Sequence, residues 1–124
     1  MGNEIKLELA EFEGLMGLGQ VRKVVELPGW KIELHTLSSL EYNEMNGRLP
    51  ADSASLPDGQ RFELIQREIL TSAVDKINDK AVSFETKKAI FSGAQLALCN
   101  LLYGEYSNML DGQNAQLQIV KKNS

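Results

Sequence analysis

The longest uninterrupted helical pattern of this chain runs from Phe84 to Leu110, and it constrains the fold more than any other segment. Ser83 is a suitable N-cap, because its hydroxyl can accept a hydrogen bond from an unpaired backbone N–H of the first turn. Asp111-Gly112 is a typical helix end. We therefore expect a single helix over 84–110, about 40 Å long at about 1.5 Å per residue. Apolar residues at the helical spacing predict its buried stripe: Ile90, Phe91, Ala94, Ala97, Leu98, Leu101, Leu102 and Met109.

Four more residues lie on the flank of this helix that faces away from the stripe: Leu96, Cys99, Tyr103 and Leu110. The helix is therefore apolar nearly all round between Leu96 and Tyr103, and a helix of this kind must be covered on both sides. Either other helices of the same subunit bury the second flank, or another protein subunit does. These four residues are the candidate partner-binding site.

Composition excludes several classes of function. The 124 residues suit one domain, and the 43% apolar content is typical of a globular protein. A net charge of -4 and a pI near 5.0 do not favour binding to a nucleic-acid backbone. Cys99 is the single cysteine, so no disulfide can form within the chain and a reducing cytosol is favoured. We expect neither a signal peptide at the N-terminus nor a membrane span.

Alternation of apolar and polar residues in the N-terminal third predicts antiparallel strands. Segments 20–27 and 30–36 are two such runs, and Pro28-Gly29 between them fits a tight turn, so we expect a hairpin. A flexible connector is expected before them at 13–19. The connector follows a further short strand that carries Ile5, Leu7 and Leu9.

Two residues of the hairpin attract attention because each is the only one of its type. Trp30 begins the second strand and is expected to anchor the core. His35 falls on the polar face of the same strand, where we expect a solvent-exposed side chain. It has no second histidine or nearby cysteine with which to bind a metal.

A short helix is predicted after the hairpin. Ser38 and Glu41 have the S-x-x-E spacing of a capping box, in which each side chain accepts a hydrogen bond from the other residue's backbone N–H. Asn46-Gly47 ends the helix. The proline-rich segment 48–59 then reads as a surface loop.

A second long helix is expected over 60–77, with Asp58 as its cap. Segment 76–82 is predicted to be a turn that brings this helix antiparallel to the helix at 84–110. Beyond Asp111 the helical spacing of apolar residues is lost. We therefore expect one domain at 1–110 and a flexible tail at 111–124, in a helix-dominated α+β fold with an N-terminal hairpin or meander followed by three helices, the last one long.

No recognised active site is found in the sequence. It contains one histidine, one unpaired cysteine and none of the common nucleophile, phosphate-binding or metal-binding motifs. Carboxylate pairs such as Asp75 and Asp79 are typical of a solvated acidic surface. We expect no cofactor, no metal and no enzymatic activity, and infer that the chain works by binding.

Three segments in this order carry a resemblance: a strand that leads into LSSLE at 37–41, a helix that passes into Val74-Asp75, and the concluding helix FETKKAIFSGAQLALCNLLYGEY. Over residues 20–110 the chain resembles the tail assembly chaperones of long-tailed bacteriophages. Segment 1–19 has no counterpart in that family.

The resemblance implies a non-enzymatic protein of the infected host's cytoplasm. Such a chaperone coats the tape-measure protein, keeps it soluble and recruits tail-tube subunits before it leaves the virion. The resemblance also implies self-association, and in many relatives a longer form made by ribosomal frameshifting, with which Lys121-Lys122 is compatible. The alternative is a structural component of the tail or baseplate, which would remain in the virion.

Overall fold

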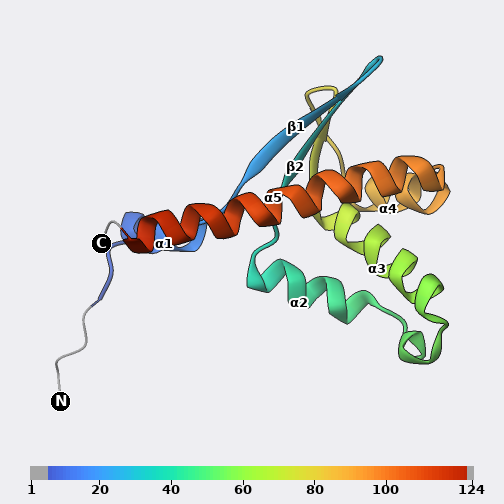
Figure 1. Ribbon diagram of the computed structural model, residues 1–124, viewed down its shortest axis with the longest axis horizontal. Helices are drawn as coiled ribbons and strands as arrows, with labels where there is room; N and C mark the ends of the chain where they lie inside the picture. The colour runs from blue at the N-terminus through green and yellow to red at the C-terminus, as the bar shows by residue number, and fades with distance from the viewer. Residues whose placement is uncertain (1–5, 123–124) are drawn as a thin grey trace.

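The computed structural model describes residues 6–122, apart from the side chain of Val120, and has the predicted helix-dominated α+β fold. A hairpin precedes the helices and the last helix is long, while a second, smaller strand pair was not predicted. The elements follow in this order (Figure 1): α1 (Leu9–Gly17), β1 (Arg22–Leu27), β2 (Trp30–His35), α2 (Ser39–Arg48), the 3-10 helix η1 (Ser53–Ser55), α3 (Asp58–Ala73), β3 (Val74–Ile77), β4 (Lys80–Ala81), α4 (Phe84–Gly93) and α5 (Leu96–Lys122).

Within the described residues, one antiparallel sheet has the strand order β1-β2-β3-β4. Its first hairpin is the predicted one: β1 and β2 pair from Arg22↔His35 to Leu27↔Trp30, and Gly29 adopts φ +81 in the turn. Glycine suits this position because it has no Cβ to clash at positive φ. The prediction for Trp30 was wrong, since this residue at the turn end of β2 is 57% exposed.

The second hairpin replaces the end of a predicted helix. α3 stops at Ala73, and the next four residues form β3 along the free edge of β2. Asn78 and Asp79 make the turn to β4 with φ +52 and +65, the backbone of a type I′ turn. Asn78 also exchanges hydrogen bonds with β2: its N–H donates to the Lys31 carbonyl, and its Oδ1 accepts from the Lys31 N–H, each at 2.7 Å. At 74–77, pairing with β2 therefore stabilises a strand, although the spacing of the apolar residues favours a helix.

The predicted single helix over 84–110 is two helices. Ser83 caps α4 as expected by accepting from the Thr86 N–H, but α4 ends at Gly93 and Ala94 has extended backbone angles of φ -70 and ψ 155. Glycine and serine are weak helix formers, so the Ser92-Gly93 pair is a favourable place for the break. α5 then continues through Asp111-Gly112 to Lys122, so the predicted helix end was also wrong.

The N-terminal segment is helical where a strand and a connector were predicted. Glu8 and Glu11 form a capping box at the start of α1, which includes Leu9 and runs to Gly17. Ile5, the first residue of the predicted strand, lies outside the described residues. No residue of α1 is buried, so packing against the rest of this subunit does not explain why the segment is helical.

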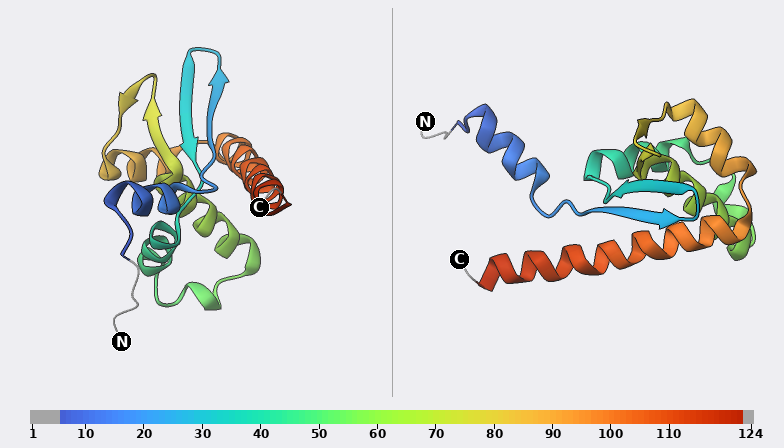
Figure 2. Two further views of the ribbon diagram at one scale, coloured as in Figure 1. Left: turned by 90° about the vertical axis from the view of Figure 1, so that its left-hand side faces the viewer. Right: turned by 90° about the horizontal axis from the view of Figure 1, so that it is seen from above.

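The hydrophobic core joins one face of the sheet to α2, α3, α4 and α5, and α5 runs beside β1 (Figures 1 and 2). Because α5 begins a new helix at Leu96, its buried face differs from the predicted stripe: Cys99 is buried, whereas Leu101 is 44% exposed. The C-terminal part of α5 extends past the sheet and lies at the same end of the molecule as α1 (Figure 1). The core residues are Val25, Ile32, Leu34, Met45, Ile69, Leu70, Ala73, Val74, Phe91, Cys99, Leu102, Tyr106 and Met109.

Candidate functional site

The four candidate partner-binding residues lie along one side of α5, at spacings of three, four and seven residues, but they are not equally accessible. Leu96 is 54% exposed, Tyr103 and Leu110 are partly buried, and Cys99 is 3% exposed. Burial raises the pKa of the Cys99 thiol. The four residues line two separate hollows, Leu96 and Cys99 in one and Tyr103 and Leu110 in the other.

The larger hollow, here called the α2–α5 groove, has a volume of about 690 Å³. α2 and α5 both pack against α3, which forms the floor between them. Tyr42 on α2 is 51% exposed and borders the groove, so an aromatic ring is available at its rim. The groove is lined by Leu37, Ser38, Ser39, Tyr42, Asn43, Ile65, Ile69, Tyr103, Tyr106 and Leu110.

Aromatic side chains organise the α5 wall of the groove. The Tyr103 ring contacts the Phe62 ring edge-on, with centroids 5.5 Å apart, and lies 6.3 Å from the Tyr106 ring. Tyr106 is 5% exposed, and burial raises its pKa. Tyrosines of this kind combine a large apolar surface with a polar end, which is why they are common in protein interfaces.

Two sets of polar contacts fix α2 beside the groove. The first is the predicted capping box, in which Ser38 Oγ accepts from the Glu41 N–H and Glu41 Oε1 accepts from the Ser38 N–H. At the other end of α2, Arg48 donates from Nε to Glu68 Oε2 at 3.0 Å and from Nη2 to Ser72 Oγ at 2.6 Å. The capping box therefore fixes the first turn of α2, and the Arg48 contacts attach its other end to α3.

The expectation of an exposed His35 was wrong. His35 is 7% exposed, its Nε2 lies 2.7 Å from Glu41 Oε2, and its Nδ1 lies 2.9 Å from Asp75 Oδ1 at an angle poorly suited to a hydrogen bond. Burial alone would raise the pKa of Glu41, but hydrogen bonds from the Ser38 backbone and from His35 lower it overall. Asp75 is on β3, so this cluster joins β2, α2 and β3. Sequence reasoning missed it because the three residues come from separate elements.

A further hollow adjoins the α2–α5 groove and shares lining residues with it. This hollow of about 220 Å³ is lined by Met16 and Leu18, by the Leu37–Ser39 segment that also lines the groove, and by Gln113 of α5. It connects the groove to α1. The exposed large apolar residues at this end of the molecule are here called the arm surface: Leu7, Leu9, Phe12, Leu15, Met16, Leu18, Leu117 and Ile119.

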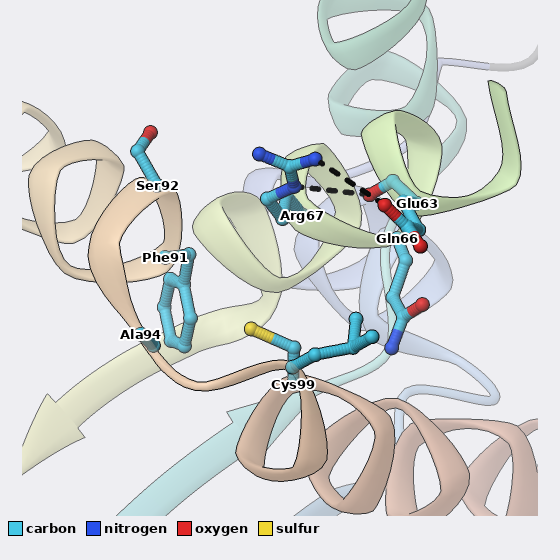
Figure 3. Close-up of a pocket in the computed structure, with 8 residues that line it drawn as sticks. Glu63, Gln66, Arg67, Phe91, Ser92, Ala94 and Cys99 are labelled. Carbon is cyan, nitrogen blue, oxygen red and sulfur yellow. Dashed lines mark hydrogen bonds and ion pairs between the residues drawn. The ribbon is translucent and has the colours of Figure 1, made fainter. Parts of the chain in front are cut away.

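The smaller hollow, here called the α3–α4–α5 pocket, has a volume of about 210 Å³ (Figure 3). Its polar side chains include Glu63, Gln66 and Arg67 from α3 and Ser92 from α4. The sequence analysis singled out two of its lining residues, Leu96 and Cys99, but the pocket itself was not predicted, because it lies at the unpredicted break between α4 and α5.

In residues 6–122, no group of three histidine, cysteine or acidic side chains is arranged to hold a metal ion. No helix in the described part of the chain is both long and apolar enough to cross a membrane. Comparison with protein-family models, with curated proteins and with solved structures gave no match.

Proposed function

We propose that this protein is a phage tail assembly chaperone that binds the tape-measure protein and recruits tail-tube subunits in the host cytoplasm, without catalysing a reaction. The α2–α5 groove carries the proposal. Its residues are apolar or aromatic along α3 and α5 and polar at the start of α2, a pattern typical of grooves that bind one face of an amphipathic helix.

The arm surface supports an elongated partner. It consists of exposed large apolar side chains on and beside α1 and at the end of α5, and side chains of this kind are candidates for burial against a partner. The hollow lined by Met16 and Leu18 joins the arm surface to the groove, so a long helix that enters the groove can continue along α1. The resemblance implies that the tape-measure protein is a large coiled-coil protein, and the apolar face of its helix would be shielded from aggregation along this path. Self-association, which the resemblance implies, is also part of the proposal and would use the α5 flank between Leu96 and Tyr103.

Co-expression with the tape-measure protein tests the proposal. The wild-type chain is expected to keep the tape-measure protein in the soluble fraction and to co-purify with it. Tyr42→Ser removes the exposed ring at the groove rim and should reduce the co-purified amount. Leu40→Ser is the matched control, because Leu40 is 68% exposed on the same helix and does not line the groove.

Two results would contradict the proposal. The first is a tape-measure protein that stays insoluble in the presence of the wild-type chain. The second is the presence of the chain in purified virions, which would favour the structural tail or baseplate component instead.

A further inference from the structure

α1 has the apolar spacing of a helix that binds in a groove, but none of its residues is buried in the described part of the chain. Leu9, Phe12 and Met16 follow the i, i+3, i+7 spacing typical of groove-binding helices, and they are between 49% and 72% exposed. Isolated helices shorter than about 12–15 residues are marginal in water, and α1 has nine residues. Its helical structure therefore points to a partner that buries this face.

The contacts that follow α1 fix its direction. The Val21 N–H donates to Thr36 Oγ1 at 3.0 Å. Gly19 has φ +85, and a Cβ at this position would lie 3.2 Å from the Leu117 side chain on α5. α1 projects from one end of the molecule (Figure 2), and among the described residues none of α1 lines the α2–α5 groove. The groove is therefore not filled by α1 of the same subunit.

The α2–α5 groove matches the apolar face of α1 in chemistry. Ile65 and Ile69 on its floor and Tyr103 on its α5 wall supply apolar surface, and no charged side chain is among its lining residues. At about 100° per residue, Glu11 and Glu13 flank the apolar face of α1, so both carboxylates can stay in solvent when that face is buried.

The position of the arm relative to the groove favours a second copy as the partner. Met16 and Leu18 line the hollow that adjoins the groove, so the C-terminal end of α1 lies near one end of the groove of its own subunit. If a twofold axis passes near this point, the α1 helix that leaves one copy reaches the groove of the other.

We propose that the α2–α5 groove binds α1 of a second copy of this chain, and that two copies exchange their α1 helices about a twofold axis. Exchange of both helices fills both grooves and closes the dimer. α1 has nine residues and ten residues line the groove, so each copy contributes close to the roughly 20–30 residues per partner of a stable interface. A single α1 helix in a single groove would provide about half of that interface.

The exchanged dimer and the tape-measure complex use the same groove at different times. Tyr103 and Leu110, two of the four candidate partner-binding residues, line the groove and would contact either occupant. The dimer concerns this chain alone, so it does not rest on the proposed function. A chain that fails to bind the tape-measure protein could still form the dimer, and a monomeric chain could still bind the tape-measure protein.

Sedimentation equilibrium of the full chain tests the dimer. The wild type should dimerise with a dissociation constant in the micromolar range or tighter. Phe12→Ser removes the central side chain of the apolar face of α1 without touching the core, and it should raise that constant at least about tenfold. Tyr42→Ser should weaken the dimer from the groove side. Trp30→Ser is the matched control, because it removes an exposed aromatic residue outside α1 and the groove, and it should change the constant less than about twofold.

A photo-crosslinking phenylalanine derivative in place of Phe12 locates α1. Isotope-labelled and unlabelled chains are mixed and irradiated, and mass spectrometry of the digest separates crosslinks between copies from those within one copy. We expect crosslinks between copies from position 12 to the groove segments 37–43, 65–69 and 103–110. Three results would overturn the proposal: a wild type that stays monomeric up to about 1 mM, unchanged dimerisation by Phe12→Ser, or crosslinks that stay within one copy or join only the two α1 helices.

Discussion

Tyr106 Oη accepts a hydrogen bond from the backbone N–H of Leu37 at 3.3 Å, which connects the middle of α5 to the segment that leads into α2. The two residues are 69 positions apart in the chain. Both line the α2–α5 groove, so this bond helps to set the distance between its walls. Because the groove exists only while α2 and α5 stay apart on α3, its stability is linked to contacts of this kind.

Tyr106→Phe removes that bond and keeps the ring. We expect the free energy of unfolding to fall by about 0.5–1.5 kcal/mol, the usual net value of one hydrogen bond. Urea unfolding followed by circular dichroism measures it. Tyr42→Phe is the control, since its ring is 51% exposed and its change should stay within about 0.5 kcal/mol. An equal effect of the two substitutions would show that the Tyr106 hydroxyl has no role in stability.

Acid should destabilise the fold through Glu41. The folded-state pKa of Glu41 lies below its ordinary value of 4.5, so its stabilising contribution is present above that pH and is lost as the pH falls through the folded pKa. The urea midpoint should therefore drop between pH 5 and pH 3, by less in Glu41→Gln than in the wild type. Glu44→Gln, an exposed change on the same helix, should leave the wild-type drop unaltered. Equal drops in all three proteins would rule out this role of Glu41.

Asp79→Gly should stabilise the protein. Asp79 has φ +65, and a left-handed backbone costs a residue with a Cβ roughly 1–2 kcal/mol, a cost that glycine avoids. The substitution also removes the ion pair with Lys31, but that pair is 3.6 Å long and exposed, so it contributes little. We expect a gain of about 0.5–1 kcal/mol in urea unfolding. Asp79→Ala loses the same ion pair and keeps the strain, so a gain in both variants would disprove the backbone argument.

Cys99 should react slowly in the native protein. It is 3% exposed, and burial raises its pKa, so little thiolate is present at neutral pH. Its reaction with Ellman's reagent at pH 8 should be at least about 100-fold slower than in urea, because the region around α5 must open first. A native rate close to the unfolded rate would show that Cys99 is accessible and that the packing of α4 and α5 around it is wrong.

Local sequence signals predicted the elements that local contacts determine. The Pro28-Gly29 turn, the capping box of Ser38 and Glu41, and the Ser83 cap were all found where expected. Each depends on residues within a few positions of one another, so its chemistry can be read from the sequence.

The errors arose where distant contacts decide the structure. The apolar residues at 74–77 continue the helical spacing of α3, but these residues form a strand because their backbone pairs with the free edge of β2. The break at Ala94 changes which face of α5 is buried, so Leu101 of the predicted stripe is 44% exposed. His35 looked exposed because its acidic partners, Glu41 and Asp75, lie on other elements.

The candidate site was predicted in part. The α5 flank at Tyr103 and Leu110 does line the groove, but the contributions of Tyr42, Ile65 and Ile69 depend on how α2 and α3 pack. Whether Leu96, Cys99, Tyr103 and Leu110 contact a partner stays a prediction, as does the division into a domain at 1–110 and a tail at 111–124. Residues 111–122 form the end of α5.

The affinity of the purified chain for the tape-measure protein, measured by calorimetry for the wild type, Tyr42→Ser and Leu40→Ser, tests the role of the α2–α5 groove most directly. Tyr42→Ser should raise the dissociation constant at least about tenfold, because aromatic residues at an interface contribute most of its energy. Leu40→Ser should change it less than about twofold. Equal affinities of the two variants, or no binding by the wild type, would contradict a partner helix in this groove.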